Sequence, residues 1–576
     1  MTKLFVTGLA AFLAIPAMAQ ETTQPEETTE VAARTSVTAQ SYMVSAANPH
    51  AAEVGRAVLA NGGSAADAAV AVQIMLNLVE PQSSGIGGGA FALYWDASEG
   101  KLSTFDGREK APLAATEEYF IGADGEPVGW WDAVVGGRSV GVPGTLKLLD
   151  TLHAKHGRTP WSTLLAPTIT KAQDGFEISP RMAASIAGAQ ERKLDLFEPT
   201  RSYFFNADGS PKAEGTLLKN PDFARTLDLI AEHGSDPFYF GAIAGDIVKA
   251  VQTPINAGIL TLEDLAQYEV IERDPICVTY RAYDVCGMGP PTSGGLTVGQ
   301  ILGLIEGFNI PGMGPTAESW HLYLEAAKLA YADRGLYMAD EDFVDMPTQG
   351  LIALDYLADR ATLINPEQAM EKASPGNPTW EEASLWSPDT QKERPGTSHF
   401  VIKDAHGDMI SMTTTIETGF GSRVMTNGFL LNNELTDFSR APMADGKPIA
   451  NRVEGGKRPR SSMSPTIVMQ NGEPVLLTGS PGGSRIINYV AKSIIAILDW
   501  EMDPQEAIDM GHVVNRNGAT DLEENTDAAT LAETLAALGH ETNIRNLNSG
   551  LHVIQIKDDM LIGAADSRRE GVALGE

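Results

Sequence analysis

The stretch of sequence that decides the fold is residues 397–415, which read TSHFVIKDAHGDMISMTTT. Two runs rich in β-branched and apolar residues flank the polar segment 404–408, a pattern typical of a β-hairpin. Thr397 and Thr415 are each nine residues from His406, which lies in the middle of that segment. The hairpin therefore predicts that the two threonines are cross-strand neighbours, to within one residue of register.

Thr397 is a candidate nucleophile because of where it stands. The preceding residues, 373–395, are rich in Pro, Gly and Ser and predict an exposed, poorly ordered linker. A threonine hydroxyl is a weak nucleophile and needs a base. If the chain is cut between Gly396 and Thr397, the new α-amino group, with a pKa of about 7.7–8.0, can be that base near neutral pH. The hydroxyl of Thr415 can then orient the nucleophile.

After residue 396 the sequence predicts mostly β-strands, and it also contains a glycine-rich motif. Residues 479–484 read GSPGGS and join a predicted strand, 474–478, to a predicted helix, 485–500. This order points successive backbone N–H groups and the positive end of the helix at one place, and the glycines allow close approach. We interpret the motif as an oxyanion hole; from the motif alone, a phosphate site or a tight turn is an equal alternative. Further strands are predicted at 397–403, 409–416, 428–431, 464–470, 552–557 and 560–565.

The first two thirds of the chain mix helices with a few strands. Residues 64–80 predict a helix, because Ser64 is a good N-cap, an Ala/Val/Leu-rich run follows and Pro81 ends it. Residues 91–95 predict a strand, helical patterns dominate 145–264, and 320–334 predicts another helix.

Two motifs in this part resemble known sites but have the wrong context. Residues 85–90, GIGGGA, match a loose dinucleotide fingerprint, but a helix enters and a strand leaves, the reverse of what phosphate binding needs. Residues 137–141, GRSVG, match a nucleophile elbow, but Pro143 and Gly144 interrupt the helix that should follow. A serine esterase that uses Ser139 is nevertheless kept as the rival hypothesis from another mechanistic class.

Composition and charge exclude several classes of function. The chain has 576 residues, 43 % of them hydrophobic, and a formal net charge of −33. These values describe a globular protein, and length alone suggests three or four domains. Nucleic-acid binding is disfavoured because it needs a positive surface, and so is adhesion to anionic lipid.

The N-terminus predicts export. Lys3 precedes an apolar run, 4–15, and Ala17-Met18-Ala19 forms a small-x-small cleavage site, so residues 1–19 are predicted to be a signal peptide. The alternative is an uncleaved anchor, although no later stretch is apolar over the length that a membrane span needs. Residues 20–40 are predicted to be a disordered, acidic Thr/Glu-rich tether. We expect a periplasmic or secreted protein without a stable membrane span.

The two cysteines fit that compartment. Cys277 and Cys286 flank a segment that alternates like two strands, and a two-residue turn at Arg281-Ala282 places them opposite one another. We predict a disulfide between them; two buried free thiols are the alternative.

Motifs spread over more than 500 residues resemble those of γ-glutamyltranspeptidases, in the N-terminal nucleophile hydrolase superfamily. The resemblance runs from about Asn48 to the C-terminus. It rests on the sequences DGRE (106–109), PPTSGG (290–295), TSH (397–399), LNNELTDF (431–438), RSSMSP (460–465), GSPGGSR (479–485), DSR (566–568) and the tail 571–575.

The resemblance implies a fold and a mechanism. The expected fold is α/β (α+β): a four-layer αββα sandwich built from one precursor, with a large subunit, 41–396, and a small subunit, 397–576. Thr397 would attack the carbonyl of Gly396 to free its own amine, and would then attack a γ-glutamyl amide. Gly482 and Gly483 would hold the oxyanion. No cofactor and no metal are expected.

The same resemblance implies the substrate. Glutathione or another γ-glutamyl small molecule would be the donor, and water, an amino acid or a dipeptide the acceptor. Arg108 with Ser461 and Ser462 would hold the α-carboxylate, since a guanidinium binds a carboxylate through two bonds. Glu417, Glu434 and Asp437 would accept from the α-ammonium.

Some alternatives stay open within the same fold. They are a glutaryl-cephalosporin-type acylase, a poly-γ-glutamate hydrolase, and an unprocessed, inactive binding or scaffold relative. The stretch 439–457, which forms a lid in several relatives, contains no Tyr or Trp, so aromatic gating of the pocket is not expected. His399 lies on the same strand face as Thr397; a structural hydrogen bond is favoured over a role as base.

Overall fold

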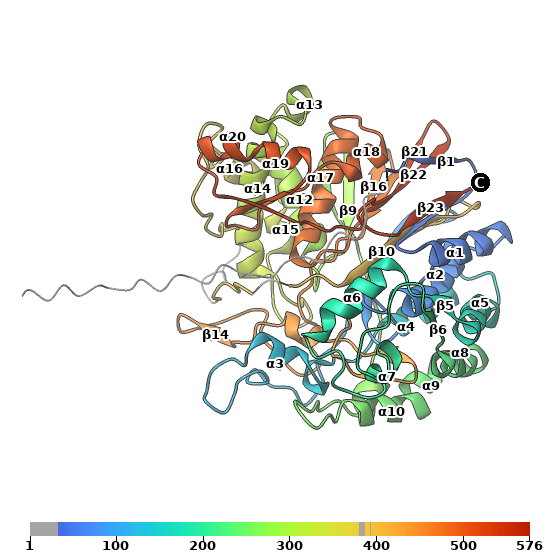
Figure 1. Ribbon diagram of the computed structural model, residues 1–576. Helices are drawn as coiled ribbons and strands as arrows, with labels where there is room; N and C mark the ends of the chain where they lie inside the picture. The colour runs from blue at the N-terminus through green and yellow to red at the C-terminus, as the bar shows by residue number, and fades with distance from the viewer. Residues whose placement is uncertain (1–32, 380–385, 392) are drawn as a thin grey trace, which may run out of the picture.

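The computed structural model describes residues 33–379, 386–391 and 393–576. Two seven-stranded antiparallel sheets lie face to face between two layers of helices (Figure 1). This is the expected four-layer αββα sandwich.

The first sheet, in spatial order, consists of β1 (Val37–Ala39), β22 (Met560–Ala565), β21 (His552–Lys557), β17 (Glu473–Gly479), β16 (Thr466–Gln470), β9 (Tyr283–Gly287) and β8 (Ile276–Tyr280). The second consists of β23 (Val572–Gly575), β2 (Met43–Ala46), β10 (Thr397–Lys403), β11 (Met409–Thr415), β3 (Gly89–Asp96), β4 (Lys101–Gly107) and β7 (Ile271–Arg273). Both sheets take strands from both sides of Gly396. The change at residue 396 to a sequence rich in predicted strands is therefore not a boundary between folding units.

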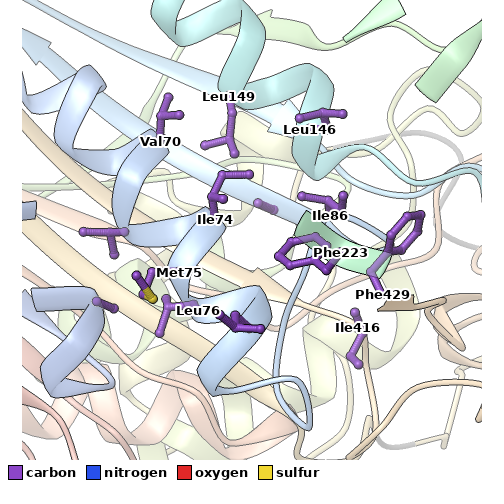
Figure 2. Packing of buried hydrophobic residues seen from close by; sticks show 14 of the residues in the cluster. Val70, Ile74, Met75, Leu76, Ile86, Leu146, Leu149, Phe223, Ile416 and Phe429 are labelled. Atoms are coloured by element: carbon purple, nitrogen blue, oxygen red, sulfur yellow. The ribbon is translucent and has the colours of Figure 1, made fainter. Parts of the chain in front are cut away.

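Helices cover the outer face of each sheet. Against the second sheet pack α1 (Pro49–Ala60), α2 (Ala65–Val79) and α4 (Thr145–His156), and α5 (Trp161–Asp174) packs on α2 with α8 (Pro221–His233) beside it. Figure 2 shows side chains of this core, with Val70 and Ile74 of α2 beside Leu146 and Leu149 of α4. Against the first sheet pack α12 (Gly294–Ile305), α14 (Ala317–Tyr337) and α17 (Ile486–Leu498).

Local sequence signals explain these elements well. Helix α2 begins after Ser64, whose side chain accepts from the backbone N–H of Asp67 while the Asp67 side chain accepts from the backbone N–H of Ser64, a complete capping box. The whole of α2 is buried, which matches its continuous apolar run. Strands β10 and β11 pair as predicted, with Thr397 opposite Thr415.

The glycines of residues 85–90 serve packing rather than ligand binding. A Cβ at Gly87 would lie 2.1 Å from the carbonyl oxygen of Leu430, and one at Gly88 would lie 1.9 Å from that of Thr415. Only glycine allows this approach, which brings the loop against the end of β11.

Two sequence predictions need correction. The predicted tether extends to residue 40, but residues 37–39 form β1, because their backbone pairs with the otherwise open edge of β22. The linker is predicted to be exposed, but Ser387, Asp389 and Glu393 are buried. Polar side chains there find charged partners inside the protein, a long-range effect that local composition does not reveal. The predicted signal peptide lies outside the described residues, and no helix among the described residues is long and apolar enough to cross a membrane.

Strands β8 and β9 form the predicted hairpin, with Cys277 paired to Cys286 and the two sulfurs bonded. Since β8 is the last strand of its sheet, the covalent link ties this edge to β9.

Replacing both cysteines with serine should lower the free energy of unfolding by about 2–3 kcal/mol, because the link closes a loop of roughly ten residues in the unfolded chain. Chemical denaturation of the wild type and the double variant measures the difference. Quantitative thiol labelling of unreduced, exported protein is the control. Two reactive thiols per chain would contradict the disulfide.

Candidate active site

Thr397 begins β10 at the centre of the second sheet, and its side chain is buried. Its Oγ1 donates to Oγ1 of Thr415 over 3.3 Å. The Thr415 hydroxyl in turn donates to the carbonyl oxygen of Gly396 over 2.9 Å and accepts from the N–H of Glu417 over 2.7 Å. One donor and two acceptor positions use the full capacity of a hydroxyl. Thr415 therefore links the hydroxyl of Thr397 to the carbonyl of Gly396.

Gly396 has to be small for this arrangement. A Cβ there would lie 1.9 Å from the carbonyl oxygen of Glu417. The close packing holds the peptide bond between Gly396 and Thr397 against the end of β11.

Gly482 and Gly483 lie where β17 passes into α17, through the short 3-10 helix η4 (Gly483–Arg485). Gly483 has a φ of +58°, which favours glycine. A Cβ at Gly483 would lie 2.7 Å from the carbonyl carbon of Arg394. In the uncut chain, the residues before Thr397 therefore lie directly on this motif.

Arg108 is fully buried and forms ion pairs with the carboxylates of Glu434 and Asp437. Its Nη1 donates to Glu434, its Nη2 donates to Asp437 over 2.6 Å, and its Nε donates to the carbonyl of Pro459 over 3.1 Å. In the uncut chain, Arg108 thus binds two of the carboxylates that the resemblance assigns to an ammonium.

The carboxyl groups of Glu417, Glu434 and Asp437 leave acceptors open. Each has one buried oxygen with no hydrogen-bond partner among the described residues. One oxygen from each lies within 4.8 Å of the others. An α-ammonium has three N–H donors, so it can satisfy such a set. Burial raises the pKa of all three, that of Asp437 to about 8, despite the neighbouring guanidinium.

The predicted site residues come together around one small cavity of about 10 Å³. Its lining includes Thr397, Thr415, Gly483, Arg108, Glu417, Glu434, Asp437, Ser461 and Ser462. Gly396 and Gly482 are the direct chain neighbours of Thr397 and Gly483.

Glu393 is a lining residue that the sequence did not predict. Its carboxylate pairs with Nη2 of Arg334 and with Nε of Arg460 at 3.2 Å, and accepts from the Ser462 hydroxyl over 3.3 Å. Burial alone would raise its pKa, but the two guanidinium groups lower it to about 2. Arg460 adjoins the serines of the RSSMSP motif, and this position could have indicated that it belongs to the site. No local sequence pattern indicates that Arg334 does.

The other predicted candidates lie elsewhere. Ser139 is buried in η1 (Gly137–Ser139), and its Oγ donates to the carbonyls of Val134 and Gly136 over 2.6 and 3.0 Å. This hydroxyl is occupied by backbone acceptors rather than by a base. His399 is buried beside Thr413, with Nδ1 and Oγ1 2.9 Å apart, and burial lowers its pKa well below the usual value.

Two side-chain groups in the described part of the chain have atoms close enough to share a metal ion. They are Glu417 with Glu434 and Asp437, and His321 with Glu325 and His540. The sequence predicts no metal site at either, because each group is completed by a residue from another part of the chain, Glu417 in the first and His540 in the second. In the first group Arg108 already supplies positive charge. In the second, Lys328 binds Glu325 over 2.9 Å, and the two histidines bind one another.

Comparison with known proteins identifies the family. The family model described as gamma-glutamyltranspeptidase matches residues 51–576. The chain belongs to the γ-glutamyltranspeptidase family. The glutathione hydrolase proenzyme of Bacillus subtilis (strain 168) is 36 % identical over 545 residues, 92 % of this chain and 91 % of the relative.

Solved structures agree with this assignment. The cephalosporin acylase from Bacillus halodurans superposes with a TM-score of 0.84 at 27 % identity, over 95 % of this chain and 97 % of that one. Helicobacter pylori gamma-glutamyltranspeptidase gives a TM-score of 0.56 at 36 % identity, over 61 % of this chain and 99 % of that one.

The pKa of Asp437 predicts a pH dependence. As the pH falls through about 8, the carboxyl cluster takes up a proton and loses an acceptor for an ammonium. For a donor with an α-amino group, kcat/KM should fall by about tenfold per pH unit below that point. Initial rates across the neutral pH range measure it. Protonation of the Thr397 amine lowers the rate for every donor, so a donor lacking the α-amino group is the control and should show the shallower fall. The same pH profile for both donors would contradict this role of the cluster.

Proposed function

We propose that this chain is an exported precursor that cuts itself between Gly396 and Thr397. The subunits 41–396 and 397–576 stay together as a heterodimer, which moves the γ-glutamyl group of glutathione or related donors to water, an amino acid or a dipeptide. The observation that carries the proposal is the hydrogen-bond chain from Thr397 through Thr415 to the Gly396 carbonyl.

In the cleavage step, Oγ1 of Thr397 attacks the carbonyl carbon of Gly396. The hydrogen bond from Thr415 polarises that carbonyl and stabilises its developing negative charge. The C–N bond breaks, the amine of Thr397 takes a proton, and an ester joins Gly396 to Thr397. Water then hydrolyses the ester, which leaves a carboxylate on Gly396 and a free hydroxyl and amine on Thr397.

Cleavage is also needed to make room. A cavity of about 10 Å³ is at the lower limit for one water molecule, so no donor fits while the chain is uncut. The residues just before Thr397 occupy the space, with Arg394 against Gly483 and Glu393 against Ser462. Their departure frees the two features that the transfer reaction needs, the Gly482–Gly483 backbone and the serine hydroxyls.

In the transfer step, Thr397 attacks the γ-carbonyl of the donor, with its own amine as the base. The N–H groups of Gly482 and Gly483 hold the oxyanion. The amide C–N bond breaks, the leaving amine takes the proton, and a γ-glutamyl ester of Thr397 remains. Water or an acceptor amine attacks this ester in the second half of the reaction and regenerates the hydroxyl.

The acylase alternative has weaker support. One similar structure is named a cephalosporin acylase, but a glutaryl donor lacks the α-ammonium. Glu434 and Asp437 are buried, and a buried carboxylate without a cationic partner is costly. When the carboxylate of a donor binds Arg108, Glu434 and Asp437 lose part of their cationic partner. The α-ammonium of a γ-glutamyl donor replaces that positive charge, whereas a glutaryl donor has none to offer.

Replacing Thr397 with alanine should abolish both cleavage and activity. On a denaturing gel the wild type should show two bands, the smaller of 180 residues (576 − 396), and Thr397→Ala should show one. Ser139→Ala is the matched control: it removes a hydroxyl from a buried site outside the machinery and should still give two bands and activity. One band for the wild type would support the alternative of an inactive scaffold protein. Loss of activity in Ser139→Ala would support the alternative of a serine esterase.

The lid segment 439–457 bears on the fate of the ester. It contains the small hairpin of β14 (Met443–Ala444) and β15 (Lys447–Pro448) and no Tyr or Trp. In the proposed reaction either water or an amine attacks the γ-glutamyl ester, so a dipeptide acceptor should raise donor turnover several-fold above hydrolysis. Steady-state rates with and without glycylglycine measure this, with an N-acetylated dipeptide as control. A rate unchanged by the acceptor would count against transfer.

A further inference from the structure

The first residues of β10 have a sheet neighbour on one side only. Residues 397–403 pair with β11, but only residues 400–403 pair with β2 on the other side. A buried backbone carbonyl at the unpaired end needs another donor. For Thr397 that donor is Arg569, whose Nη1 lies 3.0 Å from the Thr397 carbonyl oxygen.

Arg569 is held firmly in this position. It is 3 % exposed, and its Nε donates to Oδ1 of Asn548 over 2.7 Å. The amide of Asn548 donates to the carbonyl of Arg568 over 3.4 Å. The neighbouring Arg568 is anchored by ion pairs to Glu523 and Asp566. The guanidinium of Arg569 therefore reaches Thr397 from a fixed support.

We propose that Arg569 is a positioning residue for Thr397: it fixes the carbonyl of the new N-terminal residue and, after cleavage, its charge keeps the adjacent amine in the unprotonated form that acts as base. This inference rests on the proposed role of Thr397. It assigns to Arg569 a function in the reaction without contact to the donor.

Covalent geometry brings the charge close to the amine. The nitrogen and the carbonyl oxygen of one residue are three bonds apart, so a cation bound to that oxygen lies within about 6 Å of the amine. A like charge at that range disfavours protonation and lowers the pKa of the amine.

Other charged and titratable groups lie around Thr397, and they act in both senses. On the cavity side are Glu393, Glu417, Glu434 and Asp437, together with the cation Arg108. Behind Arg569 lie Arg34, His50 and Glu570, which line a second cavity of about 280 Å³ together with Arg569. Glu80 lies near Arg569 too, and is paired with Arg181 at 2.6 Å. Each ionised carboxylate favours the protonated amine and each cation disfavours it, and Arg569 is the cation that binds the Thr397 carbonyl directly.

The experiment measures the amine itself. Protein labelled with [¹⁵N]threonine carries one aliphatic amine nitrogen, that of Thr397 after cleavage, whose ¹⁵N resonance lies far from those of backbone amides. Its titration gives the pKa in the mature heterodimer. Arg569→Gln keeps an N–H donor but removes the charge, and should raise this pKa by about one pH unit. Arg569→Lys keeps the charge and should leave it near the wild-type value. The acid limb of kcat/KM should move with it.

Arg34→Gln is the matched control, since Arg34 is a guanidinium on the same cavity that donates to backbone carbonyls, among them that of Arg569 at 2.8 Å. An unchanged amine pKa in Arg569→Gln, or an equal rise in Arg34→Gln, would overturn the inference. If Arg569→Gln and Arg569→Lys both lose kcat without a change in this pKa, the role is structural only, which also overturns it. Failure of the proposed function is distinguishable, because an uncut wild-type chain would give no amine resonance.

Discussion

The pairing of β10 with β11 is the constraint on which the rest of this structure depends. It places two hydroxyls opposite one another at the end of a central strand pair, with the Gly396 carbonyl within reach of one of them. Because both strands lie inside the second sheet, neither can shift without disturbing the core on both faces. A rigid sheet thus holds the hydroxyl of Thr397 close to the peptide bond that precedes it.

Charge is the second constraint, and it is local. The chain is strongly acidic, yet its site is built around one buried guanidinium and several carboxyl groups. Arg108 stabilises Glu434 and Asp437 in the uncut chain, while three carboxyl oxygens of the site remain without partners among the described residues. A site of this kind suits a zwitterion. The negative group of the ligand would take the place of a carboxylate on Arg108, and its positive group would pair with the carboxylate that Arg108 releases.

The segment before Thr397 packs on the donor side of this site. Glu393 places a carboxylate between Arg334, Arg460 and Ser462, and it accepts from one donor atom of each. The same segment covers Gly483. A single stretch of chain therefore fills the donor side of the pocket and supplies the carbonyl to which Thr415 donates.

Much of this was readable in the sequence, because short-range rules decide it. The polar turn segment 404–408 set the register of the 397–415 hairpin, a capping box started α2, and a two-residue turn paired Cys277 with Cys286. The motifs of the family resemblance indicated the site residues, and in the structure these residues surround one cavity. What only the tertiary structure decided depends on partners distant in the chain. Glu393 is buried because Arg334 and Arg460 meet it, residues 37–39 form a strand because β22 offers an open edge, and Arg569 matters because β2 stops short of Thr397. In each case the deciding energy is a hydrogen bond or ion pair between segments that only the folded sheets bring together, and no local pattern records it.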